Sequence, residues 1–318
     1  MITLLFQYFS EMAIWNNFNT NVEAVVERCT SVFEPVNTIK LFKGSLLFFV
    51  LLYVVQFLPI AQQYFGPGNY LIPYYKSSNI FLKPLNLLEG NSFSAYYLFF
   101  IYGLLGSILA YFFLPYKRLS LVISYILLMN LYHKTSPLQT GGFSLLTMVI
   151  FMLLFIDEDA EKTSNKYWKT IKITIANFSF LAIRLQVIFL YLVASYFKLQ
   201  GETWVDGTAF YYVLFNEMYA HPFFTNLFID NTFIVKSVSW FTLLFQMFFP
   251  IFVWIKKTKN SVLMLGIFLH IMIALVMGIV DFGIIMILMY TLFNSEAFNT
   301  KLLAFFIKPF SKNKSIKA

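Results

Sequence analysis

The chain has 318 residues, of which 59% are hydrophobic, 20% are aromatic and only 12% are charged. Soluble domains carry about 25% charged residues, so this composition excludes an ordinary water-soluble domain and indicates that lipid is the solvent. The single cysteine, Cys29, excludes an internal disulfide and a cysteine-based metal site.

The predicted elements begin with a segment outside the membrane. Residues 1–40 mix apolar and acidic positions, and we expect a cytoplasmic or interfacial amphipathic segment that ends at a turn near Pro35. Residues 1–15 have neither a basic start nor a small-residue cleavage site, so we do not expect a cleavable signal peptide.

A bundle of membrane-spanning helices is expected over residues 41–297. A span needs about 20 apolar residues to cross about 30 Å of hydrocarbon. Eight apolar runs approach or reach that length, namely residues 41–60, 95–114, 119–131, 142–156, 173–197, 233–255, 262–279 and 282–293. These runs are apolar on every face, whereas the strands of a membrane barrel alternate. We therefore expect an all-α, polytopic transmembrane helical bundle of about eight spans.

The basic residues predict the orientation of this bundle. With the N-terminus in the cytoplasm, seventeen of the 23 Lys and Arg residues lie on the cytoplasmic side and five lie on the other side. This bias follows the positive-inside rule and needs an even number of spans. Both termini are thus expected in the cytoplasm, with residues 298–318 as a basic tail, in an inner or plasma membrane. The net charge of +8 then indicates contact with anionic lipid rather than with nucleic acid.

Polar residues of the fifth span predict a functional stripe. Arg184, Tyr191, Ser195 and Lys198 share a face about 60° wide, because steps of 7, 11 and 14 residues return near the starting direction. Arg184 is about 21 Å below Lys198, so the stripe could form one wall of a polar path from the outer mouth. Each residue has a structural alternative: Lys198 extends its amine to the interface, Arg184 clamps carbonyls or a carboxylate, and Tyr191 packs.

Two histidines are further candidates. His270 lies near the middle of the seventh span, where a structural and a functional role are equally expected. Asp281, eleven residues later, is expected to mark the turn into the eighth span. His221 belongs to the largest outer loop, residues 199–232, and a lone histidine in a loop is usually just solvated.

Motifs of other protein classes are missing from the sequence. It has no P-loop, no dinucleotide fingerprint, no HExxH motif and no nucleophile elbow. Three histidines and one cysteine spread this widely do not form a zinc site, so no metal is expected. The sequence also lacks the paired, broken spans of many transporters, which makes a transporter the least favoured class.

From residue 181 onward the chain resembles a known family. The residues that carry the resemblance share an order and a spacing, and they are Arg184, Gln186, Tyr191, Lys198, Leu199, Trp204, Asp206, Gly207, His270, Phe282 and Tyr290. In this order they are similar to the core of the HTTM family, the transmembrane domain shared with vitamin K-dependent gamma-carboxylases. The resemblance extends more weakly over the rest of residues 41–294.

The resemblance implies roles for five residues of the spans. In the carboxylases, a lysine at the position of Lys198 is the base that deprotonates a vitamin K hydroquinone, and His270 matches a histidine of the same domain. Both are therefore implied as catalytic residues. A lysine in a desolvated pocket can be neutral near pH 7, so this chemistry is physically allowed. Arg184, Gln186 and Tyr191 would contact the cofactor, a reduced quinone of the menaquinone or vitamin K type.

The resemblance also implies a substrate-facing loop and leaves two functions open. Trp204, Asp206, Gly207 and His221 belong to this loop. One function is a membrane-embedded enzyme with carboxylase-like chemistry, acting on a quinone, an exported peptide or both. Carboxylases have a histidine shortly after the Lys-Thr-Ser loop and continue into a large β-rich domain. The sequence, which ends at Ala318, contains neither feature. We therefore do not expect glutamate carboxylation by this chain alone.

The second function implied by the resemblance is a maturation role. A smaller HTTM subgroup takes part in maturing an exported peptide toxin, and its members are of nearly this length. The alternative is therefore a non-catalytic maturation or accessory factor whose partner is a small exported peptide.

Overall fold

The computed structural model describes residues 23–67, 83–89, 95–135, 139–217 and 220–311. Within these ranges the chain is helical and contains no strand, which confirms the predicted all-α class. Most of the predicted amphipathic segment, residues 1–22, lies outside the described ranges, and residues 23–31 form a helix.

Each of the eight predicted spans coincides with a helix. These helices are α3 (Val36–Gln56), α6 (Tyr97–Phe113), α7 (Lys117–Lys134), α8 (Gly141–Leu153), α9 (Lys166–Gln200), α13 (Thr232–Phe252), α14 (Lys259–Val276) and α15 (Val280–Tyr290). Four of them, α3, α9, α13 and α14, are long and apolar enough to cross a membrane, whereas α6, α8 and α15 are shorter apolar helices. The chain is therefore a membrane protein, and the total of eight crossings and the position of the termini stay predictions.

Shorter helices connect these elements. The α-helices are α4 (Ala61–Phe65), α10 (Glu202–Val205), α11 (Ala209–Phe215), α12 (Pro222–Phe228) and the final α16 (Glu296–Ser311). The 3-10 turns are η1 (Leu58–Ile60), η2 (Lys83–Leu85), η3 (Leu87–Glu89), η5 (Ala160–Lys162) and η6 (Thr291–Phe293).

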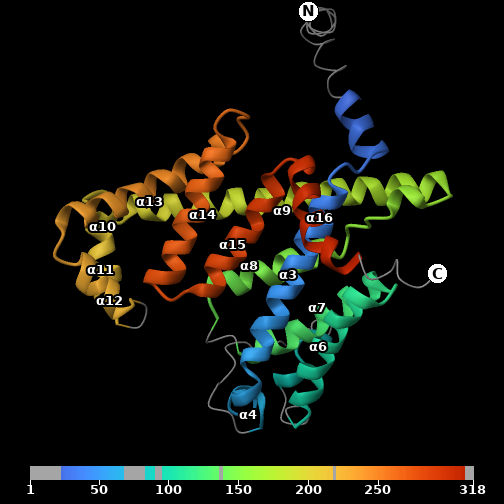
Figure 1. Ribbon diagram of the computed structural model, residues 1–318, viewed down its shortest axis with the longest axis horizontal. Coiled ribbons are helices and arrows are strands. Elements are labelled where there is room, and N and C mark those ends of the chain that lie inside the picture. The colour runs from blue at the N-terminus through green and yellow to red at the C-terminus, as the bar shows by residue number, and fades with distance from the viewer. Residues whose placement is uncertain (1–22, 68–82, 90–94, 136–138, 218–219, 312–318) are drawn as a thin grey trace, which may run out of the picture.

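Three pairs of helices dominate the packing of the bundle. Helices α6 and α7 form one antiparallel hairpin, α14 and α15 form another, and α9 lies along α13 (Figure 1). Helix α3 is the most enclosed candidate span, because 56% of its apolar window is buried, against 28–33% in the other three. The pairing of α9 with α13 and the α14–α15 hairpin together position the polar stripe described below.

Small and polar residues fasten α15 to its neighbours. A Cβ on Gly283 would lie 2.7 Å from the backbone oxygen of His270, so glycine allows α14 and α15 to approach this closely. Asp281 lies in the first turn of α15, as predicted, and accepts a hydrogen bond from the hydroxyl of Thr140. Thr140 also caps α8 by accepting from the amide of Gly142 at 3.2 Å. The first turns of α8 and α15 are thus held together.

The C-terminal helix α16 is tied to the start of α3. The Glu296 carboxylate accepts hydrogen bonds from the amides of Asn37 and Thr38 at 2.7 and 3.0 Å. It therefore caps amides in the first turn of α3 that have no partner within the helix. Asn299 is fully buried and donates to the Thr38 hydroxyl at 2.9 Å and to the carbonyl of Thr291 at 2.8 Å. The predicted division at residue 297 lies inside α16, and the cytoplasmic tail beyond it stays a prediction.

Large apolar side chains cover the surface of the bundle. Phe113 is 81% exposed and Phe233 is 80% exposed, and many other aromatic and aliphatic side chains point outward from the long helices. In water an apolar surface of this extent would drive association, whereas in a bilayer it is ordinary lipid contact. The exposed apolar side chains therefore agree with the apolar composition, which indicates that lipid is the solvent.

Candidate functional site

Helix α9 carries the predicted polar stripe. Its 35 residues correspond to about 52 Å, which exceeds the roughly 30 Å of hydrocarbon in a bilayer. Arg184 lies beside Trp254, directly after the end of α13, and Lys198 lies beside Trp204, near the start of α13. The stripe therefore runs along α13 from its start to its end, and Arg184 is at the level of the C-terminal end of α13.

At the centre of the stripe, Tyr191 joins two other buried polar side chains. Its hydroxyl is 2.8 Å from Nε2 of His270 on α14, and it also hydrogen-bonds the hydroxyl of Tyr290 on α15. Tyr191, His270 and Tyr290 are 0%, 1% and 2% exposed. We call these three residues the buried trio. Tyr290 belongs to the residues that carry the family resemblance, but no role is predicted for it from the sequence.

The surroundings of the buried trio are aromatic and closely packed. The Tyr191 ring lies 4.5 Å from that of Phe249, centroid to centroid, and Gly266 leaves the space that the Tyr290 ring fills. Nδ1 of His270 is buried and has no hydrogen-bond partner among the described residues. The trio could pass a proton between its hydroxyls and the imidazole, but it is closed off from the surface by its packing.

Lys198 lies apart from the buried trio. Its Nζ stands 4.7 Å from the centre of the Trp204 ring, a cation–π contact between two predicted site residues. No carboxylate of the described residues lies within ion-pair distance of this amine. Because Lys198 follows Tyr191 by seven residues, the two are separated by about 10 Å along α9. The structure does not bring together the two residues predicted to be catalytic.

Arg184 is held by aromatic rings at the other end of the stripe. Its guanidinium carbon is 4.3 Å from the ring centre of Trp254, 5.0 Å from Phe293 and 5.5 Å from Phe180. No ion pair of Arg184 is found in the part of the chain that the structure describes, and its Nε is buried without a hydrogen bond. Gln186, two residues later, points about 200° away around the helix, so it does not share this stripe.

The predicted substrate loop forms a turn that docks on α13. Gly207 has φ of 84°, and a Cβ there would lie 3.0 Å from Trp240, so this position requires glycine. The indole of Trp240 donates to the carbonyl of Val205 at 3.1 Å. The hydroxyl and amide of Thr208 donate to Asp206 at 2.7 and 2.8 Å, and they hold the pKa of the Asp206 carboxyl below its ordinary value. The turn fixes where Trp204 meets Lys198.

His221 has a structural position in the same segment between α9 and α13. Its Nδ1 accepts from the amide of Phe223 at 3.3 Å and so caps α12. Its own amide donates to the carbonyl of Val276 at 2.9 Å, which fixes the start of α12 against the end of α14. His221 is exposed, and these hydrogen bonds do not include Lys198 or a member of the buried trio.

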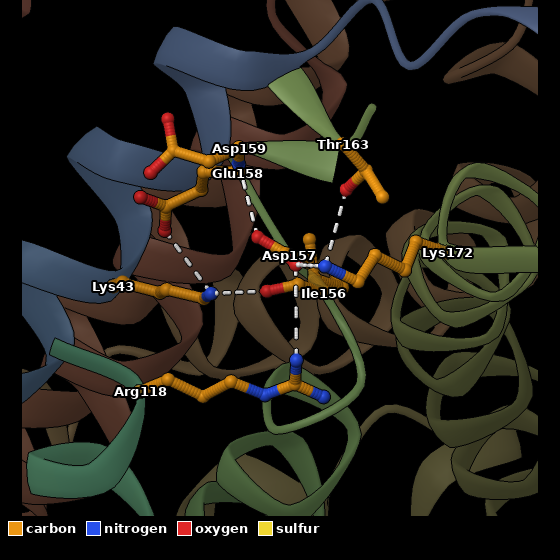
Figure 2. A network of polar contacts seen from close by, with 8 residues as sticks. All are labelled: Lys43, Arg118, Ile156, Asp157, Glu158, Asp159, Thr163 and Lys172. Carbon is orange, nitrogen blue, oxygen red and sulfur yellow. Dashed lines mark hydrogen bonds and ion pairs between the residues drawn. The ribbon is translucent and has the colours of Figure 1, made fainter. Parts of the chain in front are cut away.

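A second polar cluster, whose residues were not predicted as a site, lies where α8 ends (Figure 2). Lys43 of α3 is 5% exposed, and its Nζ is 3.0 Å from the Glu158 carboxylate and 2.8 Å from the carbonyl of Ile156. The neighbouring Asp157 carboxylate is 3.1 Å from Lys172 and 3.7 Å from Arg118. Three consecutive acidic residues after the fourth span, and a lysine inside the first, were the signals in the sequence.

Two cavities lie away from the polar stripe. One, of about 290 Å³, is lined largely by aromatic side chains including Tyr53, Phe57 and Phe143. The other, of about 590 Å³, is bordered by the second polar cluster. None of the predicted site residues lines either cavity. The contact of Arg184, Gln186 and Tyr191 with a reduced quinone therefore stays a prediction.

Comparison with known proteins gives two relatives from Bacillus subtilis (strain 168). The chain is 29% identical over 160 residues to the sporulation-delaying protein SdpB, a match that covers 46% of this chain and 49% of SdpB. It is 36% identical over 120 residues to the uncharacterized protein YitO, covering 36% of this chain and 38% of YitO. The matches thus span about half, or less, of the length of these relatives.

No protein-family model and no solved structure matches the chain. The two relatives are distant, and the resemblance to the HTTM family stays a prediction.

Proposed function

We propose that this chain is a membrane-embedded maturation factor for a small exported peptide, and that it meets the peptide at the Lys198 end of α9. The observation that carries the proposal is the placement of Lys198 over Trp204, beside the α10–α12 segment and apart from His270. The similarity to the sporulation-delaying protein SdpB, together with the HTTM subgroup that matures a peptide toxin, supports the same function. The expected location is the plasma or inner membrane, with this end of α9 outside.

The segment beside Lys198 offers a surface suited to a peptide leaving the membrane. Exposed aromatic side chains are present on α11 and α12, which follow the turn in the chain, and they are Tyr211, Tyr212, Phe215 and Phe223. Aromatic side chains supply large contact areas with little loss of conformational freedom. Lys198, held in position by Trp204, adds a cation that can bind a carboxylate or a backbone carbonyl of the peptide.

A catalytic role of Lys198 is the second candidate, and a specific observation favours it. The amine is partly buried against an indole ring, and no described carboxylate forms an ion pair with it. Loss of water and lack of a counter-ion both favour the neutral amine, which is the form that acts as a base.

Two substitutions of Lys198 separate these functions. In a producing host, deletion of the gene should remove a small peptide from the mass spectrum of the culture supernatant, and the wild-type gene should restore it. Lys198→Ala should lower its yield at least tenfold, because the cation is lost. Lys198→Arg keeps a cation but cannot act as a base, so it should retain most of the yield if Lys198 recognises the peptide and abolish it if Lys198 is a base.

The matched control is Lys236→Ala, which removes an exposed lysine of α13 near the same turn. It should leave the peptide yield unchanged, and the membrane abundance of all variants should be equal by immunoblot. Full yield with Lys198→Ala would exclude the Lys198 end of α9 as the site. An unchanged supernatant after deletion of the gene would contradict the maturation function itself.

A further inference from the structure

The larger cavity lies at the end of the bundle where most basic residues are predicted to gather. Its volume is about 590 Å³, and it is formed by the turn between α6 and α7, the end of α8, the acidic residues that follow α8, and α3. Tyr111 and Tyr116 line it together with Lys117 and Arg118. The cavity is therefore bordered by both charged and apolar groups.

The carboxylates at this cavity are already neutralised. Glu158 lies 3.0 Å from Lys43, Asp157 lies 3.1 Å from Lys172, and Asp159 lies 2.6 Å from Lys162. Each acidic side chain of the lining thus has a lysine within ion-pair distance (Figure 2 shows the first two pairs). They leave little negative charge to repel an anion.

Lys117 and Arg118 are the two cations of the lining that can still bind an anion. Arg118 reaches Asp157 only at 3.7 Å, and its side chain is 64% exposed. Lys117 is exposed, has no ion pair among the described residues, and stands 5.7 Å from the centre of the Tyr111 ring. With the lysines that pair the acids, five cations face three carboxylates here, so the cluster has an excess of positive charge.

These two cations also occupy an unusual place on their helix. Lys117 and Arg118 are the first two residues of α7, whose first turn has no acidic residue and whose N-cap, Tyr116, makes no side-chain hydrogen bond. A helix start carries partial positive charge and favours anions, so two cations there raise the local positive potential further. A bound anion would relieve this repulsion.

The rest of the lining is apolar and continues toward the hydrocarbon. It is provided by the side chains of Leu119, Leu121, Val122, Leu153 and Leu154. Basic pockets between membrane helices on the cytoplasmic side are suited to anionic lipid head groups. We propose that this cavity binds an anionic phospholipid. The phosphate lies between Lys117 and Arg118, and an acyl chain lies along the apolar part of the lining.

Lipid binding to the purified full-length protein in mild detergent tests this proposal. Dioleoyl phosphatidylglycerol should raise the midpoint of thermal unfolding by roughly 5 °C, because a ligand that binds only the folded state stabilises it. Lys117→Gln/Arg118→Gln should lose this shift, and native mass spectrometry should show fewer retained phosphatidylglycerol molecules. Lys117→Gln alone, which breaks no described ion pair, should lose part of the shift and guards against misfolding of the double variant.

The controls show whether the thermal shift comes from this basic pair and from an anionic lipid. Lys256→Gln/Lys257→Gln removes an exposed basic pair from the turn between α13 and α14 and should keep the full shift. Dioleoyl phosphatidylcholine and inorganic phosphate should each produce no comparable shift. An equal shift in the Lys117/Arg118 variant, its loss in the Lys256/Lys257 variant, or an equal response to inorganic phosphate would each overturn the proposal.

Discussion

Replacement of Glu158 by alanine should lower the free energy of unfolding by about 3–5 kcal/mol, since it leaves a buried ammonium group without its counter-ion. Lys43 is 5% exposed and Glu158 is 11% exposed, so water can replace the lost carboxylate only from the side of the neighbouring cavity. The carbonyl of Ile156, 2.8 Å from the ammonium, satisfies only one of its donors. Unfolding of the purified protein in mixed micelles with increasing dodecyl sulfate measures this change.

Two further variants show that the loss comes from the unpaired charge. Lys43→Met/Glu158→Leu removes both charges and should recover most of the stability, because apolar residues of similar volume can replace a buried ion pair. Glu34→Ala breaks the exposed Arg28–Glu34 pair, whose side chains are 72% and 58% exposed, and should change stability by less than about 1 kcal/mol. An effect of Glu158→Ala no larger than that of Glu34→Ala would contradict the buried position of Lys43.

The second large effect is expected for Gly266→Ala in α14. A Cβ at this position would lie 2.6 Å from both Cζ and the hydroxyl oxygen of Tyr290. The Tyr290 ring is buried and hydrogen-bonded to Tyr191, so it cannot rotate away without breaking the buried trio. Overpacking of this kind costs about 1–3 kcal/mol, measured by the same unfolding titration.

Gly106→Ala is the matched control for this substitution. Gly106 lies inside α6, and a Cβ there would meet no heavy atom within 4 Å. The added methyl group should leave stability unchanged or raise it by up to about 1 kcal/mol, because alanine favours a helix over glycine. If Gly266→Ala and Gly106→Ala behave alike, Tyr290 does not lie against α14 as described.

The fold was predictable to the extent that it depends on local composition. The eight helices are where the apolar runs are, and a run that crosses lipid must form its backbone hydrogen bonds within a helix. The first and last residues of the helices were less predictable from the sequence. Helix α9 begins at Lys166, although the predicted span begins at residue 173, because Asn165 caps the helix and the lysines of its first turns do not interrupt it. Helix α3 begins at Val36, where the distant Glu296 caps it.

The candidate site was predictable only along a single helix. Helical spacing placed Tyr191 and Lys198 on one face of α9, but spacing contains no information about which residues of other helices face them. The contacts of Tyr191 with His270 and Tyr290 join residues 79 and 99 positions apart in the chain. Lys43 and Glu158 are separated in the same way, so neither the buried trio nor the second polar cluster could be found without the packing of the helices.

The two polar ends of α9 differ in what holds them. Arg184 is surrounded by Trp254, Phe293 and Phe180, so its charge is satisfied by aromatic faces near the predicted inner interface. Lys198 contacts one ring, that of Trp204, and the α11–α12 segment that follows Trp204 in the chain carries exposed aromatic residues. This difference is why the proposed contact with a peptide is placed at Lys198.

The proposed function requires the Lys198 end of α9 to face outside the cell, and labelling of single cysteines tests this most directly. Cys29 is the only cysteine of the chain, so Cys29→Ser provides a background without thiols. In it, Asp230→Cys reports the segment between α12 and α13, and Lys257→Cys reports the turn between α13 and α14; both positions are exposed. In intact cells a membrane-impermeant maleimide should label Asp230→Cys, and it should label Lys257→Cys only after permeabilisation. The reverse pattern would place Lys198 and Trp204 in the cytoplasm and contradict a role in maturing an exported peptide at this end.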